Sequence, residues 1–173
     1  MIQIKEVLMK DRFHVKVAYS DIHDDGTTTD YVVTSDQAPR PEFIGAMEDL
    51  APDIMKIIGI QCVGTETPDY YTNMKGVSFK HIQDGRFNAV LKAVIYVPWL
   101  DANVAINSPL MGTKPKDGAL GAYFGADTEK KLRTVLSEAL SYIKGKRAQE
   151  VLFDEPTPAT TKQVKGGGMK LIG

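Results

Sequence analysis

The chain lacks the cysteines that form disulfide cross-links and the long apolar runs that hold a protein in a membrane. Its 173 residues include one cysteine, Cys62, which excludes an intrachain disulfide. No apolar run approaches the length of about 20 residues that crosses a bilayer, and residues 1–6 lack the basic and apolar pattern of a secretory leader. We therefore expect a cytoplasmic protein without membrane segments, in which Cys62 is a small buried hydrophobe.

An excess of one charge is also missing, because 21 basic and 22 acidic side chains leave a formal net charge of −1. The inference to nucleic acid that a strongly basic composition supports therefore does not apply. The balance is uneven along the chain: residues 1–59 carry 6 basic and 11 acidic side chains, and residues 129–173 carry 9 and 5. With 43% hydrophobic and 25% charged residues, the composition is typical of one globular domain.

Apolar residues that alternate with polar ones predict strands in the first third of the chain. Segments 2–4 and 13–19 show this period and are joined by a predicted turn at residues 10–11. A polar connection over residues 21–28 leads to a third predicted strand at 31–34. These segments predict an antiparallel, hairpin-connected sheet.

Proline and helical spacing predict a helix next. Pro41 suits the first turn of a helix, and apolar residues recur at helical spacing from 43 to 58. Pro52 should kink this helix or divide it in two near residue 51, and Gly59 should end it.

The second half repeats this order of strands and helix. Segment 76–81, a turn at 83–85 and a long strand over 87–97 predict another hairpin, whose second strand is central and covered on part of each face. Residues 98–125 are rich in Gly and Pro and predict a long excursion with a short strand at 104–107.

A final helix is predicted to begin behind an Asp127 cap and to end at Gly145. Its apolar stripe consists of Leu132, Val135, Leu136, Ala139, Leu140 and Ile143. Residues 149–173 are too polar and too rich in Gly and Pro to fold alone, so we expect a disordered, flexible C-terminal tail.

The fold class expected from these segments is α+β: a mainly antiparallel sheet of two strand-rich units, with two principal helices packed on it. We expect a single domain over residues 1–148. Both Lys10–Phe13 and Asp84–Phe87 open the second strand of a predicted hairpin, which is the pattern that a diverged duplication of halves 1–59 and 60–148 would leave.

Signals for metal or enzyme chemistry are weak. The densest group of metal-ligand residues is His14, Asp21, His23, Asp24 and Asp25, but a hairpin connection needs Asp and Gly for its backbone alone. The sequence contains no phosphate-binding loop. The closeness of Cys62, Ser78 and His81 in the sequence does not by itself supply an oriented nucleophile and base. We predict no metal, no cofactor and no catalytic residue.

Aromatic and basic residues alternate around the central hairpin. Stacking rings on a basic sheet are typical of single-stranded nucleic-acid binding. The aromatic members are Tyr70, Tyr71, Phe79 and Phe87, and the basic members are Lys75, Lys80, Arg86 and Lys92. The alternative interpretation places Phe79 and Phe87 opposite each other in the core and makes the lysines a solvated face.

A short motif follows the last predicted helix. Gln149, Leu152 and Phe153 match the bacterial sliding-clamp-binding pentapeptide, whose usual form is Gln-Leu-Ser/Asp-Leu-Phe, which residues 149–153 resemble. Glu150 and Val151 depart from it and remove part of the usual hydrophobic contact. The resemblance implies a polar anchor at Gln149 and apolar anchors at Leu152 and Phe153. The alternative is that Leu152 and Phe153 fold back onto the domain core.

Further short segments occur along the chain in the order Pro39–Phe43, Lys75–Phe79, Asn107–Pro109 and Tyr142–Gln149. With the hairpins, they resemble a family of small bacteriophage and prophage early-region proteins. The family implies no catalytic residues; it implies a setting near phage recombination and single-stranded DNA-binding functions.

The function expected from these features is that of a non-enzymatic accessory protein of DNA replication or recombination whose tail docks on the host sliding clamp. Two alternatives stay open: a single-stranded nucleic-acid-binding protein, and an inhibitor of a host enzyme. In the second, Asp21, Asp24 and Asp25 of the acidic first sixty residues would mimic a polyanion.

Overall fold

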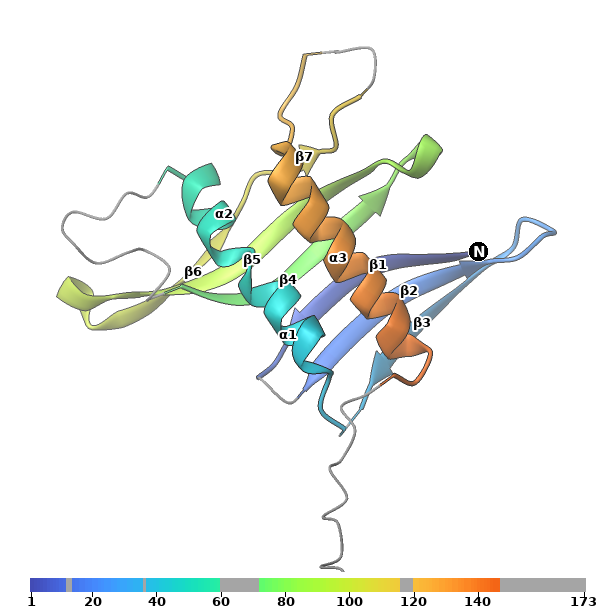
Figure 1. The fold of residues 1–173 in the computed structure, drawn as a ribbon, viewed down its shortest axis with the longest axis horizontal. Helices are drawn as coiled ribbons and strands as arrows, with labels where there is room; N and C mark the ends of the chain where they lie inside the picture. The colour runs from blue at the N-terminus through green and yellow to red at the C-terminus, as the bar shows by residue number, and fades with distance from the viewer. Residues whose placement is uncertain (12–13, 36, 60–71, 116–119, 147–173) are drawn as a thin grey trace, which may run out of the picture.

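The computed structural model is an α+β fold in which helices cover one face of an antiparallel sheet (Figure 1). It describes residues 1–11, 14–35, 37–59, 72–115 and 120–146. The strands are β1 (Ile2–Met9), β2 (Val15–Ile22), β3 (Thr28–Thr34), β4 (Thr72–His81), β5 (Phe87–Val97), β6 (Ala102–Asn107) and β7 (Met111–Gly112). The helices are α1 (Pro41–Glu48), α2 (Ala51–Ile57) and α3 (Ala126–Ile143), with short turns η2 (Gln83–Gly85) and η3 (Pro98–Leu100). The predicted fold class is confirmed.

The two predicted strand-rich units form one continuous sheet. Its strand order is β3-β2-β1-β4-β5-β6, with β7 paired to β5, and every neighbouring pair is antiparallel. The units meet at β1 and β4, where only three residue pairs join Glu6–Leu8 to Gly76–Ser78. By contrast, β4 and β5 share nine pairs. The described halves are therefore linked by a short seam.

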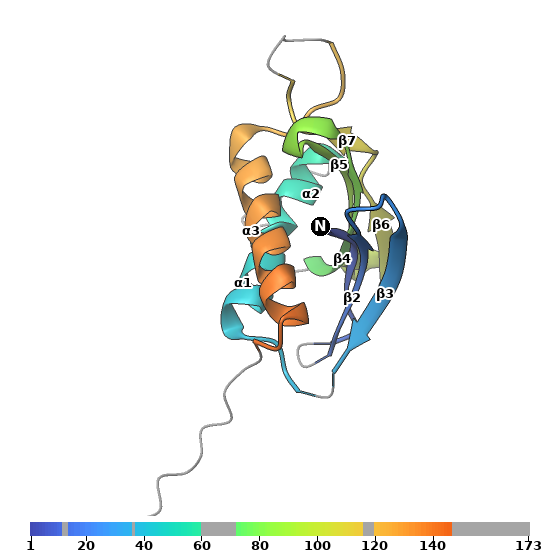
Figure 2. The ribbon, with the colours of Figure 1, turned by 90° about the vertical axis from the view of Figure 1, so that its right-hand side faces the viewer.

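The hydrophobic core lies between the sheet and the helices, as the side view shows (Figure 2). Every second residue of β5 is buried on this side, namely Phe87, Ala89, Leu91, Ala93 and Ile95. Tyr142 of α3 is 1% exposed, packs edge to face on Phe43 of α1 and donates a hydrogen bond from its hydroxyl to the carbonyl of Val15. Strands of both halves and all three helices share this one core.

Proline and glycine set the helix boundaries as predicted. Pro41 is the first residue of α1, and the expected break separates α1 from α2, in which Pro52 is the second residue. Gly59 has a φ of +72° just after α2, a conformation that favours glycine.

Several predicted bounds are corrected. Gly125 occupies the N-cap position of α3, and Asp127 lies within the first turn, where its carboxylate pairs with Lys131 at 3.2 Å instead of capping the helix. β3 begins at Thr28, three residues before the prediction, because it pairs with β2 along its whole length. The alternate side chains of β5 away from the helices are mostly half-buried and have no described helix over them.

The predicted excursion over residues 98–125 contains more regular structure than its composition indicates. β6 starts at Ala102 and pairs with the end of β5, and β7 returns to pair with the beginning of β5. Tyr123, which precedes α3, forms an isolated β-bridge with Gly112. The predictions for Cys62 and for the tail from residue 149 lie outside the described residues.

Candidate interaction surface on the uncovered face of the sheet

The sheet has a second face, directed away from the helices, which we call the uncovered face (Figure 2). Side chains alternate along a strand, so the neighbours of the buried residues point to this side. It is formed by Gln3, Glu6 and Leu8 of β1, Lys16, Ala18 and Ser20 of β2, Asp30, Val32 and Thr34 of β3, Asn73, Gly76, Ser78 and Lys80 of β4, Asn88, Val90, Lys92, Val94 and Tyr96 of β5, and Asn103, Ala105 and Asn107 of β6.

Strand register arranges these residues in rows across the sheet. Lys16, Leu8, Gly76, Lys92 and Asn107 are successive partners across five strands. With strands about 4.8 Å apart, this row is roughly 19 Å long. Residues from the first and the middle third of the sequence are thus brought onto one surface.

A carboxylate stands at the centre of the uncovered face. Glu6 accepts hydrogen bonds from Lys92 Nζ at 2.7 Å and from Ser78 Oγ at 3.2 Å. Burial raises the pKa of the Glu6 carboxyl, but the hydrogen bonds and charge of Lys92, the hydroxyl of Ser78 and the charge of Lys16 outweigh it and leave this pKa below its ordinary value. Glu6 is therefore ionised at neutral pH and is shared between two lysines.

Gly76 makes the seam between the two halves possible. A Cβ at this position would lie 2.5 Å from the carbonyl oxygen of Val7 and 2.6 Å from Cδ2 of Leu8, closer than real contacts allow. The missing side chain therefore lets β4 approach β1 and keeps the centre of the uncovered face flat.

The basic residues predicted for nucleic-acid binding occupy this face to different degrees. Lys80 and Lys92 lie on it, with Lys80 exposed and Lys92 paired to Glu6. Arg86 directly precedes β5, and the alternation places it on the side of Asn88. Lys75 occupies the bulge of β4 between Met74 and Gly76.

The predicted stacking aromatics do not join them. Phe79 and Phe87 are 7% and 1% exposed, lie on the helix-covered face and form an edge-to-face pair with centroids 5.5 Å apart. The alternative interpretation, which places Phe79 and Phe87 together in the core, is confirmed, and their burial excludes them from a stacking platform. Tyr70 and Tyr71 lie outside the described residues.

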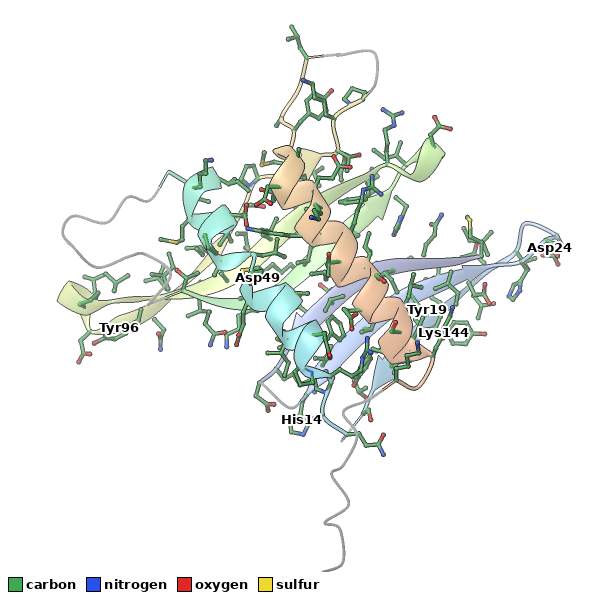
Figure 3. All side chains as sticks on the ribbon, in the orientation of Figure 1. His14, Tyr19, Asp24, Asp49, Tyr96 and Lys144 are labelled. Carbon is green, nitrogen blue, oxygen red and sulfur yellow. The ribbon has the colours of Figure 1, made fainter. Side chains whose placement is uncertain are left out.

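The asparagines and Tyr96 were not singled out from the sequence. All four asparagines of the chain, Asn73, Asn88, Asn103 and Asn107, lie on the uncovered face. Tyr96, at the end of β5 near β6 (Figure 3), donates a hydrogen bond to Asp101 Oδ1 at 2.7 Å. Strand alternation in 87–97 was a sequence signal that could have placed Asn88 and Tyr96 beside Lys92.

The described residues also line a groove of about 1010 Å³ where β4 extends past the β1–β2 hairpin. Met9, Met47 and Met74 line it together with charged residues from α1, α3 and β4. Asp49, which follows α1, marks its helix side (Figure 3). Because carboxylates and ammonium groups both contribute, charge does not select a ligand for this groove.

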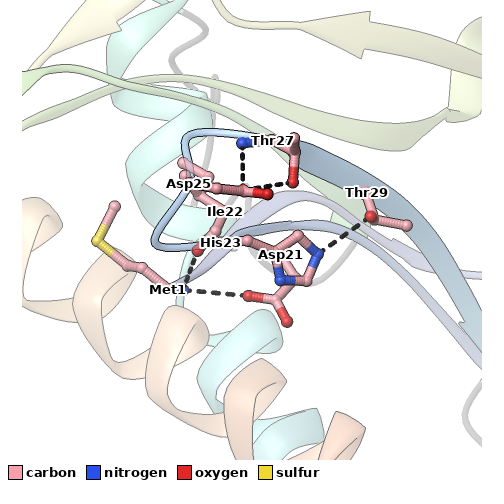
Figure 4. Close-up of polar contacts among 7 residues, drawn as sticks. All are labelled: Met1, Asp21, Ile22, His23, Asp25, Thr27 and Thr29. Atoms are coloured by element: carbon pink, nitrogen blue, oxygen red, sulfur yellow. Dashed lines mark hydrogen bonds and ion pairs between the residues drawn. The ribbon is translucent and has the colours of Figure 1, made fainter.

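The acidic and histidine cluster considered for metal binding is dispersed. His14 precedes β2 and Asp24 follows it, so the two lie at opposite ends of the strand (Figure 3). The amino terminus pairs with Asp21 at 3.1 Å, Asp25 accepts hydrogen bonds from Thr27, and His23 bonds to Thr29 (Figure 4). Within the described residues no group of three or more potential ligands could hold a metal ion.

Ser78 and His81 do not form a nucleophile and base. Ser78 lies on the uncovered face, whereas His81 lies on the other side of β4 and donates a hydrogen bond from Nε2 to the carbonyl oxygen of Ile4 at 2.7 Å. Their side chains point to opposite faces of the sheet.

Comparison with known proteins gives no relative: no family model, curated protein or solved structure matches the chain. No helix in the described part of the chain combines the length and the hydropathy needed to cross a membrane. The predicted clamp-binding residues Gln149, Leu152 and Phe153 lie outside the described residues.

Proposed function

We propose that this protein is a non-enzymatic accessory protein of DNA replication or recombination, of the bacteriophage early-region kind, that docks on a bacterial sliding clamp. The observation that carries the proposal is the motif at residues 149–153. Gln149, Leu152 and Phe153 stand at the spacing at which clamp-binding pentapeptides carry their polar and apolar anchors.

The end of α3 supports this proposal. Gly145 has a φ of +88°, and the amides of residues 144–146 donate to the carbonyls of Leu140, Ser141 and Tyr142. The last turn of the helix is therefore closed by its own backbone, as in other glycine-terminated helices. Gln149 begins three residues after the last described residue, so the hydrogen bonds that end α3 do not draw on the motif.

Burial of the two apolar anchors supplies the expected affinity. A leucine or phenylalanine side chain that leaves water for a groove contributes about 1.5 to 3 kcal/mol. Ordering the peptide and losing its rotational freedom oppose this, so we expect a dissociation constant of about 1 μM for one site. A ring-shaped clamp with several equivalent sites would strengthen the apparent binding.

Calorimetry with the full chain and a purified bacterial sliding clamp tests the proposal. We expect the double variant Leu152→Ala, Phe153→Ala to bind at least about tenfold more weakly than wild type. The matched control is Leu171→Ala, Ile172→Ala, which removes a similar apolar pair from the same tail and should leave affinity unchanged. Absence of wild-type binding, or equal losses in the two double variants, would refute the docking role.

A further inference from the structure

The four asparagines of the uncovered face have no evident role in the fold. Asparagine is among the residues that strands disfavour, since its side chain competes for backbone hydrogen bonds. Yet Asn73, Asn103 and Asn107 are exposed on β4 and β6, and Asn88 lies on β5. An amide offers two donors and an acceptor, which suits contacts to both bases and phosphates.

Cationic side chains surround these amides. Lys16, Lys80, Arg86 and Lys92 share the face with Glu6, and Asp30 at its β3 side is already paired with Lys5 at 2.7 Å. Within the described residues neither Lys80 nor Arg86 forms an ion pair, so both charges are available to a ligand. Although the whole chain is nearly neutral, this face carries more positive than negative charge, and a polyanion complements it.

The shape of the face indicates an extended ligand. Gly76, Ser78, Ala18 and Ala105 leave little or no side chain between the lysines and the amides, so the centre of the face is open, and at its β6 end Asn73, Tyr96 and Asn103 also line the groove described above. Tyr96 at one corner is 36% exposed, and its hydroxyl is held by Asp101. An open sheet face suits a strand whose bases are unpaired, whereas a duplex is usually read by an element that enters a groove.

We propose that the uncovered face binds single-stranded nucleic acid, with Lys80, Arg86 and Lys16 holding phosphates and the asparagine amides contacting bases. The row from Lys16 to Asn107, roughly 19 Å long, accommodates several nucleotides. This activity needs no residue of the clamp-binding motif and holds whether or not the protein docks on a clamp.

Fluorescence anisotropy of the full chain with labelled oligothymidylate of about 20 nucleotides tests the proposal. At about 50 mM salt we expect Lys80→Glu, Arg86→Glu to bind at least about tenfold more weakly than wild type and to show a shallower salt dependence. The matched control is Lys56→Glu, Lys130→Glu, which makes the same charge change at exposed positions on α2 and α3. It should stay within about twofold of wild type.

A neutral variant separates base contacts from charge. Asn103→Ala, Asn107→Ala on the exposed strand β6 should lower affinity by about threefold and leave the salt dependence as it is, because no phosphate contact is lost. Thermal unfolding identical to wild type would exclude misfolding as the cause. Leu152→Ala, Phe153→Ala should bind the oligonucleotide like wild type, which distinguishes this proposal from clamp docking.

Four results would overturn the proposal. The first three are no binding by the wild type at low salt, equal losses in the two charge-reversal variants, and affinity for a duplex as high as for the single strand. The fourth is a heparin fragment of similar charge that binds as tightly as the oligonucleotide, because the amides would then add nothing to a general polyanion surface.

Discussion

Leu91 and Lys92 are neighbours on β5, yet they belong to opposite faces of the sheet. Leu91 is fully buried beneath the helices, whereas Lys92 is about one-third exposed and pairs with Glu6. The helix-covered face is lined by aliphatic and aromatic residues, whereas the uncovered face mixes amides, lysines and small residues with a few apolar ones such as Leu8, Val90 and Val94. Alternate residues of the same strands therefore serve stability and binding. The loss of stability on substitution should depend more on the face of the sheet than on the position along the strand.

On both sides of the sheet, a carboxylate accepts hydrogen bonds from one hydroxyl and one ammonium group, but the two sites differ in burial. On the helix side, Asp53 of α2 accepts hydrogen bonds from Thr128 and Lys131 of α3. On the uncovered face, Glu6 accepts them from Ser78 and Lys92. Asp53 is more deeply buried, so loss of its carboxylate should be felt more strongly.

The largest difference is expected between Leu91→Ala and Lys92→Ala. Removing the Leu91 side chain leaves a cavity in the covered core and should lower the free energy of unfolding by about 2 to 5 kcal/mol. Removing Lys92 breaks one partly exposed ion pair and should lower it by less than about 1 kcal/mol. Urea denaturation measures both, and similar losses would contradict the division between faces.

Gly76→Val should have the next largest effect, because its side chain would collide with β1 at the seam. We expect a loss of about 1 to 3 kcal/mol in the free energy of unfolding, measured by the same denaturation. Gly45→Ala in α1 is the control, since a Cβ there meets nothing within 4 Å. Alanine should raise stability by about 0.5 to 1 kcal/mol at that helical position. A tolerated Gly76→Val would mean that the seam is looser than its contacts indicate.

Local features of the sequence were enough to predict much of this fold. The alternation of apolar and polar residues predicted the hairpins. Pro41, Pro52 and Gly59 predicted the ends of α1 and α2, because each residue restricts the backbone beside it. The pairing of β1 with β4 had no such signal, since it joins residues about 70 apart through three pairs and a glycine that looks ordinary in the sequence. Whether the halves formed one sheet or two was therefore open until the structure placed them.

The candidate surface was only partly predictable for a related reason. The residue types of the central hairpin singled out Lys80 and Lys92, and also Phe79 and Phe87. Strand alternation, however, places each phenylalanine on the face opposite its basic neighbour. The apolar Val90 and Val94 on the uncovered face obscured which set of β5 faces the core. If Phe79 and Phe87 are placed in the core, strand alternation excludes both rings from the uncovered face and adds Asn88 to it.

Asp53→Ala is expected to have a smaller effect than Leu91→Ala or Gly76→Val. It leaves the hydroxyl of Thr128, a buried residue, without its acceptor and the ammonium of Lys131 with Asp127 alone, at a cost of about 1 to 2 kcal/mol. The hydrogen bond to Asp53 raises the pKa of Lys131, so this contribution is present below the ordinary lysine pKa and is lost as pH rises through the raised one. Denaturation at neutral pH should show a larger loss for Asp53→Ala than for Glu6→Ala, and the reverse order would contradict the role of burial.

The smallest effect is the acid dependence that Glu6 adds on the uncovered face. Because the folded-state pKa of Glu6 lies below its ordinary value of 4.5, its contribution is complete above that value and is lost as pH falls through the folded pKa. Glu6→Gln should therefore be less stable than wild type by under about 1 kcal/mol near pH 6, and this difference should shrink toward pH 3. Urea midpoints across this range measure it, and in a Lys92→Met background the pH dependence of the difference should weaken, because the main partner of the carboxylate is gone. A difference that stays constant with pH in the presence of Lys92 would mean that Glu6 acts through packing and that the charge pair at the centre of the uncovered face contributes nothing to stability.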